Sequence, residues 1–122
     1  QHWKDHLFYA VAKEFSYESD PPPADTQCGG TCLVVNNTGL YPALVVFAGR
    51  SLSAPNQVRH LATERRLPAN YLEGLNLTRF AVLDDEFKYQ SGTETGTFND
   101  IVYCIQFQTS GSDTRVPKVD PC

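Results

Sequence analysis

Hydrophobic and polar positions alternate in several short runs, and this pattern predicts a protein built mainly from β-strands. The most apolar run covers residues 41–48, whose length and β-branched content favour a buried strand over a helix. Residues 98–107 form a second strong run, because alternate side chains of a strand point to opposite faces. One face would carry Ile101, Tyr103, Ile105 and Phe107, and the other Val102 and Cys104.

Weaker apolar runs predict further short elements. Residues 6–12 suit a strand or the end of a helix, and residues 32–36 are rich in β-formers. A turn at residues 37–39 would join residues 32–36 to residues 41–48 in a hairpin. Short strands are also expected at residues 76–83 and 86–90.

Polar and proline-rich stretches separate these runs. Residues 13–27 contain three consecutive prolines and predict an exposed loop. Residues 53–67 would form a short surface helix or stay irregular, and residues 68–74 suit one helical turn between Pro68 and Gly74. Residues 108–121 form a polar tail. The pattern as a whole predicts α+β architecture in one domain over residues 1–122, dominated by an antiparallel sheet.

Length and charge narrow the class of protein. A chain of 122 residues can bury one hydrophobic core. Its net charge of −4 argues against a surface that binds nucleic acid all over. The chain has no methionine and begins at Gln1, so we expect that an upstream segment was removed. No run reaches the roughly 18 apolar residues of a membrane span.

Four cysteines predict disulfides and an oxidising compartment. Three pairings can be drawn, and we favour Cys28–Cys32 with Cys104–Cys122, because the second bridge would tether the C-terminal tail. The competing interpretation is a zinc site, but its ligands usually come as two closely spaced pairs, whereas Cys104 and Cys122 are far apart in sequence.

Basic residues cluster in the middle of the chain. The interpretation we favour is a solvated face, and the alternative is a patch that contacts the phosphates of DNA or binds a host surface. Its members would be Arg50, Arg59, Arg65, Arg66 and Arg79.

Two polar clusters raise the hypothesis of a calcium site. Asp84 and Asp85 precede a predicted strand, and Asn99 and Asp100 open the last strong one. Calcium prefers six to eight oxygen ligands. The alternative is that Asn99 and Asp100 only begin the strand.

Motifs for catalysis are missing. The chain contains no nucleophile elbow, phosphate loop or dinucleotide fingerprint. We therefore expect no enzymatic activity, and no cofactor unless calcium binds. Asn-x-Thr sequons occur at Asn36 and Asn76, and they matter only if the source glycosylates exported asparagines.

Three stretches resemble landmarks of the type IV pilins and type II secretion pseudopilins. Gln1-His2-Trp3-Lys4-Asp5-His6-Leu7-Phe8-Tyr9 resembles the tryptophan turn that leads into the first strand, although Lys4-Asp5 replaces Gly-Asn. Residues 44–50, LVVFAGR, resemble the middle strand of that family. Residues 98–102, FNDIV, resemble the start of its last strand, and residues 70–74, NYLEG, lie between them.

The resemblance implies a filament subunit. Its head would pack an antiparallel sheet of about four strands on an N-terminal helix that is mostly absent from these residues. That helix would hold the subunit in the bacterial inner membrane, with the head in the periplasm, before assembly with other pilin or pseudopilin subunits. The resemblance also implies that Cys104–Cys122 bounds a surface loop over residues 105–121, and that calcium binds in the last hairpin.

Three hypotheses therefore leave the sequence in order of preference. The first is a structural minor pilin or pseudopilin, and the second is a surface or tip pilin that binds DNA or a host surface through arginines. The third, a small secreted hydrolase, has the least support.

Overall fold

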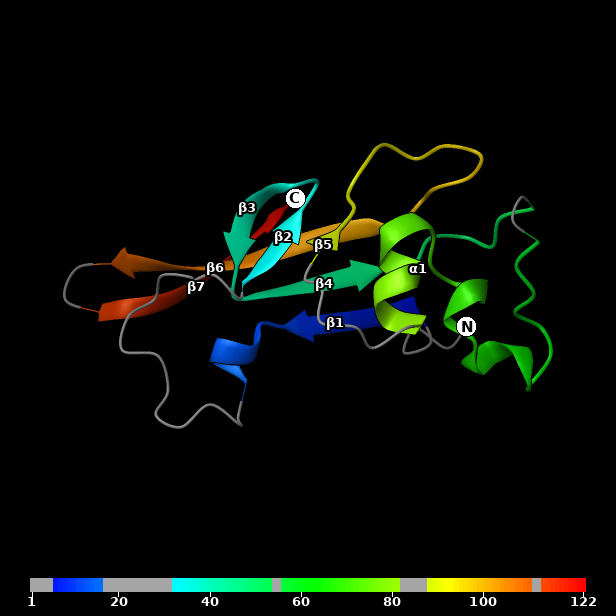
Figure 1. The fold of residues 1–122 in the computed structure, drawn as a ribbon, viewed down its shortest axis with the longest axis horizontal. Helices are drawn as coiled ribbons and strands as arrows, with labels where there is room; N and C mark the ends of the chain where they lie inside the picture. The colour runs from blue at the N-terminus through cyan, green and yellow to red at the C-terminus, as the bar shows by residue number, and fades with distance from the viewer. Residues whose placement is uncertain (1–5, 17–31, 54–55, 82–87, 111–112) are drawn as a thin grey trace.

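Two sheets and a short helix form the described part of the chain, which comprises residues 6–16, 32–53, 56–81, 88–110 and 113–122 of a computed structural model (Figure 1). The larger sheet is antiparallel, with strand order β1 (Leu7–Val11), β4 (Ala43–Phe47), β6 (Ile101–Ser110), β7 (Asp113–Pro121). The smaller sheet has the order β3 (Thr38–Tyr41), β2 (Leu33–Val35), β5 (Lys88–Tyr89), and β2 and β5 run parallel. The prediction of α+β architecture with a four-stranded antiparallel sheet is confirmed.

The helical elements lie between β4 and β5 and after β1. They are η2 (Lys13–Phe15), η3 (Glu64–Arg66), η4 (Pro68–Asn70) and α1 (Gly74–Ala81), of which only α1 is an α-helix. Pro68 begins η4, as expected, because its fixed φ and missing N–H suit the first helical position.

The core lies on one face of the larger sheet. Leu44 and Val46 of β4 and Val102 of β6 are almost fully buried there. They pack against β2 and β5 of the smaller sheet and against α1, which contributes Leu77 and Phe80. In Figure 1 the smaller sheet lies across the middle of the larger one, and α1 lies at the end where β4 finishes.

The predicted hairpin between residues 32–36 and 41–48 is wrong. β2 pairs with β3, and the connecting residues Asn36 and Asn37 both have positive φ, 52° and 60°. Two such residues form the type of tight turn whose twist matches paired strands. The turn therefore comes one residue earlier than expected, and β4, which begins after Pro42, is left to pair with β1 and β6.

The predicted strand at residues 76–83 is also wrong, because residues 74–81 form α1. Leu77 and Phe80 are three positions apart, which places both on the same side of a helix, where they reach the core. Gly74 begins the helix with φ of 55°, a conformation that glycine adopts without steric cost.

The polar tail is more regular than its sequence suggests. β7 pairs with β6 over almost its whole length, with Val119 opposite Ile105. Its prolines, Pro117 and Pro121, are tolerated because β7 is an edge strand. Residues 105–121 are thus mostly a β-hairpin and not an open loop.

The prediction that Cys104 pairs with Cys122 is confirmed, with 5.5 Å between the two Cα atoms. The N–H of Cys122 also donates to the carbonyl of Val102 at 2.9 Å. Cys32 is buried, whereas Cys28 lies outside the described residues, so its pairing with Cys32 stays a prediction.

We expect replacement of both Cys104 and Cys122 by serine to lower the free energy of unfolding by about 3 kcal/mol, from the entropy that an 18-residue loop regains in the unfolded chain. Urea unfolding monitored by circular dichroism measures the change. Addition of a reductant to the serine variant should then have no further effect on this bridge. A stability equal to that of the parent would show that the β6–β7 pairing alone holds the tail.

Candidate functional site

The second face of the larger sheet is apolar but has no layer packed over it among the described residues. Cross-strand partners share a face of a sheet. Three rows of paired residues therefore lie side by side there: Leu7–Phe47–Ile101, Tyr9–Val45–Tyr103–Pro121 and Val11–Ala43–Ile105–Val119. We call these eleven residues the open face.

The open face exposes large apolar side chains to an unusual degree. Tyr9 is 72% exposed, Ile101 54% and Val119 56%, and Leu7 and Phe47 are also exposed. Soluble monomers rarely leave a contiguous apolar patch uncovered, and such patches usually mark an interaction surface. The alternation on β6 that the sequence predicted is confirmed, but its outward face is apolar where a solvated sheet would be polar.

A buried polar network joins the larger sheet to the segment before α1. The backbone N–H of Glu73 and the side-chain amide of Asn76 both donate to Oδ2 of Asp100, at 3.2 and 3.0 Å. In return, Glu73 accepts hydrogen bonds from the backbone N–H of Asn99 and from the side-chain amide of Gln57. The sequence analysis missed Gln57, Glu73 and Asn76, and the only signal was the position of Glu73 within the NYLEG stretch.

The network changes the acidity of one of its carboxyl groups. Burial raises the pKa of Asp100 to about 7, with the nearby Glu73 carboxylate adding to this rise. The hydrogen bonds from Asn76 and from the Glu73 N–H act in the opposite direction. The second oxygen of Asp100, Oδ1, is buried and has no hydrogen-bond partner among the described residues, which also disfavours a full negative charge.

The calcium residues are only partly described. Asp84 and Asp85 lie outside the described residues. Asn99 and Asp100 are buried, and their polar atoms serve the network and the Arg50 carbonyl. Within the described ranges no group of three or more His, Cys, Asp or Glu side chains could hold a metal ion. The calcium site stays a prediction.

Arg59, one of the five basic residues, is built into the protein. Its guanidinium donates to the carbonyls of Gly49 and Asn70 and to Gln57, and it lies 4.6 Å from the centre of the Tyr71 ring. Burial lowers its pKa, and the nearby Tyr71, Glu73 and Asp100 oppose this shift. Arg59 therefore positions Tyr71 and the Arg50–Asn70 region.

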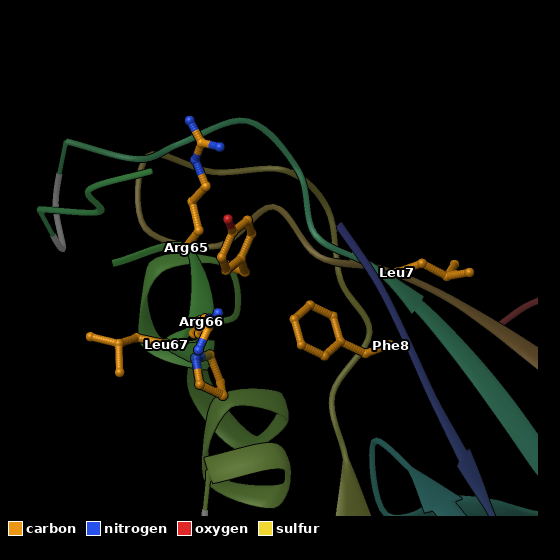
Figure 2. Close-up of a pocket in the computed structure, with 7 residues that line it drawn as sticks. Leu7, Phe8, Arg65, Arg66 and Leu67 are labelled. Carbon is orange, nitrogen blue, oxygen red and sulfur yellow. The ribbon is translucent and has the colours of Figure 1, made fainter. Parts of the chain in front are cut away.

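The other arginines occupy different surroundings. Arg50 forms an exposed ion pair with Glu94 at 3.2 Å, and Arg79 lies on α1. Arg65 and Arg66 of η3 are exposed and border a cleft beside β1 (Figure 2).

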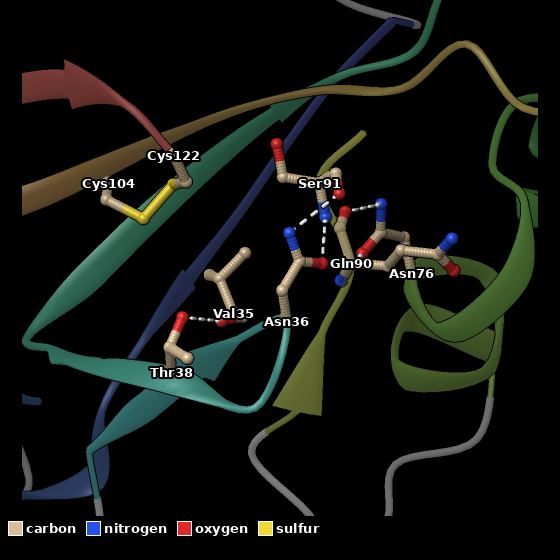
Figure 3. Close-up of a disulfide and its surroundings, with 8 residues drawn as sticks. All are labelled: Val35, Asn36, Thr38, Asn76, Gln90, Ser91, Cys104 and Cys122. Carbon is tan, nitrogen blue, oxygen red and sulfur yellow. Dashed lines mark hydrogen bonds between the residues drawn. A yellow bond between two sulfur atoms is a disulfide. The ribbon is translucent and has the colours of Figure 1, made fainter. Parts of the chain in front are cut away.

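Two asparagines hold the chain after β5 in place. The side chain of Asn36 exchanges two hydrogen bonds with the backbone of Ser91, and that of Asn76 exchanges two with the backbone of Gln90 (Figure 3). Each amide thus replaces a neighbouring strand. Asn76 is also fully buried, so the sequon at Asn76 is inaccessible in the folded head.

No protein-family model, curated protein or solved structure matches this chain. In the described part of the chain the longest helix, α1, has 8 residues and does not reach the length needed to span a membrane.

The raised pKa of Asp100 predicts that stability falls as pH rises. An unfolded Asp titrates near 3.9. Between that value and about 7 the folded protein binds more protons than the unfolded chain, so this group's contribution is present below pH 4 and lost as pH passes 7. We expect the free energy of unfolding to fall by roughly 1–2 kcal/mol from pH 5 to pH 8 through Asp100.

Urea unfolding at several pH values measures this dependence. Asp100→Asn should flatten the curve, because an amide keeps the acceptor and does not titrate. The exposed Asp120 on β7 supplies the control, since Asp120→Asn should leave the slope unchanged. Parallel curves for the parent and Asp100→Asn would contradict the assignment.

Proposed function

We propose that this chain is the globular head of a type IV pilin-like subunit, a minor pilin or pseudopilin. The observation that carries the proposal is the open face, an apolar sheet surface of the size and position that a packed helix requires. The resemblance of residues 1–9, 44–50 and 98–102 to pilin landmarks supports the same conclusion.

The helix would be an N-terminal segment that precedes residue 1 in the full-length protein. β1 follows residue 5 closely and forms one edge of the larger sheet, so a helix entering there could fold back over the open face. Leu7, Tyr9 and Val11 of β1 would be the first side chains it meets. Covering apolar surface contributes on the order of 25 cal/mol per Å².

The proposed subunit would have two partners in turn. Before assembly, its helix would hold it in the inner membrane with the head in the periplasm. After assembly, the helices of neighbouring pilin or pseudopilin subunits would pack together in the filament. The Cys104–Cys122 disulfide fits this route, because such bonds form and persist outside the reducing cytosol.

A second copy of the head is the competing occupant of the open face, since two sheets can pack face to face. The two occupants differ in their dependence on concentration. A dimer of heads would appear in sedimentation experiments on residues 1–122 alone, whereas the proposed helix belongs to the same chain and covers the face at any concentration.

Thiol labelling can test whether the open face is covered in the full-length protein. We expect a cysteine at Ile101→Cys to react at least about tenfold more slowly in the detergent-solubilised full-length subunit than in residues 1–122, because the helix excludes the reagent. Leu61→Cys is the matched control, since Leu61 is 50% exposed and Ile101 54%. Equal ratios at the two positions, or a reading frame that encodes no apolar helix before residue 1, would contradict the proposal.

Filament assembly tests the function itself. We expect Ile101→Glu to abolish incorporation of the subunit into filaments in the source cells, because a charge would be buried under the helix. Leu61→Glu should leave incorporation unchanged. Thermal unfolding of both variants in residues 1–122 should show similar midpoints, since both positions are exposed in the isolated head. Normal filaments that contain Ile101→Glu would count against the proposed role.

A further inference from the structure

A small cleft lies between β1 and the turns η3 and η4, and no part of the filament proposal uses it (Figure 2). Its walls are the side chains of Phe8, Pro68 and Tyr71, with the Phe8 and Tyr71 rings 6.2 Å apart. Leu7 and Leu67 lie at its margins, and in Figure 2 their side chains point away from Phe8. Arg65 and Arg66 border the opening.

The cleft accepts an apolar group of limited size. Its volume is about 160 Å³. A cavity of roughly 150 Å³ lined by apolar side chains holds a benzene ring. The Tyr71 hydroxyl is the one side-chain hydrogen-bonding group that the walls supply, so a nucleobase would lose the hydrogen bonds of its polar edges on entry. A phenylalanine or leucine side chain loses none.

The rim attracts negative charge. In the described part of the chain, neither Arg65 nor Arg66 forms an ion pair with a carboxylate. The acid next to them in sequence, Glu64, instead accepts a hydrogen bond from the Asn70 side chain at 3.2 Å. Nε of Arg65 donates to the Arg59 carbonyl, which leaves its outer nitrogens for a ligand.

The two arginines leave η3 in different directions, so their charges flank the opening instead of meeting at one point (Figure 2). The walls are firmly placed, because Arg59 lies against the Tyr71 ring and η4 fixes Pro68. A preformed apolar cleft with a few charged groups at its rim is the usual form of a recognition site.

We propose that this cleft binds an acidic peptide segment of a partner protein. One phenylalanine or leucine of the segment enters between Phe8, Pro68 and Tyr71, and carboxylates on either side of that residue pair with Arg65 and Arg66. Arginine forks suit carboxylates because two parallel N–H groups meet two oxygens. Nucleic acid is disfavoured by the apolar walls and by the net charge of −4.

Fluorescence anisotropy on residues 1–122 tests the proposal without any filament. The probe is a fluorescein-labelled peptide that carries one phenylalanine between two pairs of glutamates, in low-salt buffer. We expect a dissociation constant on the order of 100 μM, as suits one anchor and two charge pairs. Replacement of the phenylalanine by alanine, or of the glutamates by glutamines, should each weaken binding at least about tenfold.

Protein variants locate the site. The double variant Arg65→Glu with Arg66→Glu should weaken binding at least about tenfold, and both side chains are exposed, so the fold should persist. Lys118→Glu on β7 reverses an exposed charge away from the cleft and should have little effect.

Three outcomes would overturn the proposal. They are equal affinity for the phenylalanine and alanine peptides, an equal loss with Lys118→Glu, and no binding at millimolar peptide. Tighter binding of labelled oligothymidylate than of the peptide, lost in the double arginine variant, would assign the cleft to nucleic acid instead. None of these results depends on whether the chain assembles into filaments.

Discussion

Leu44 and Val46 of β4 point to the same side of the larger sheet as Val102 of β6, and their burial there organises the rest of the molecule. The small sheet, α1 and the segment before it all pack on that side. Because successive side chains of a strand point to opposite faces, the same strands must present Val45, Phe47 and other apolar residues on the second side. A sheet that is apolar on both sides needs two covering layers, and the described residues provide one.

The covering layer is fixed to the sheet by polar contacts as well as by apolar packing. Asp100, just before β6, accepts hydrogen bonds from Glu73 and Asn76 at the start of α1. Buried polar groups are costly when unpaired, so this network permits few relative positions of helix and sheet. The resulting placement of η3 and η4 beside β1 also creates the arginine-bordered cleft. The filament proposal and the peptide proposal therefore concern neighbouring but separate surfaces.

Local patterns predicted the strands better than their partners. Residues 41–48 and 98–107 became β4 and β6 because apolar alternation is a local property. The strand expected at residues 76–83 is a helix, since Leu77 and Phe80 gain more by reaching the core from one helical side. The hairpin partner of β2 was missed because two asparagines with positive φ closed the turn one residue early. The polar tail became β7 because its hydrogen bonds to β6 and the disulfide outweigh its weak strand propensity.

The sequence by itself determined the α+β class, the alternation along β6, the pairing of Cys104 with Cys122 and the resemblance that led to the filament hypothesis. Only the tertiary structure decided which side of the sheet is covered, that Arg59 is bound within the protein, and that Arg65 and Arg66 border a cleft. It also placed Gln57, Glu73 and Asn76 around Asp100 and Asn99. The reason is physical: alternation depends on neighbours in the chain, whereas burial, pKa and charge pairing depend on residues that folding brings together from distant segments.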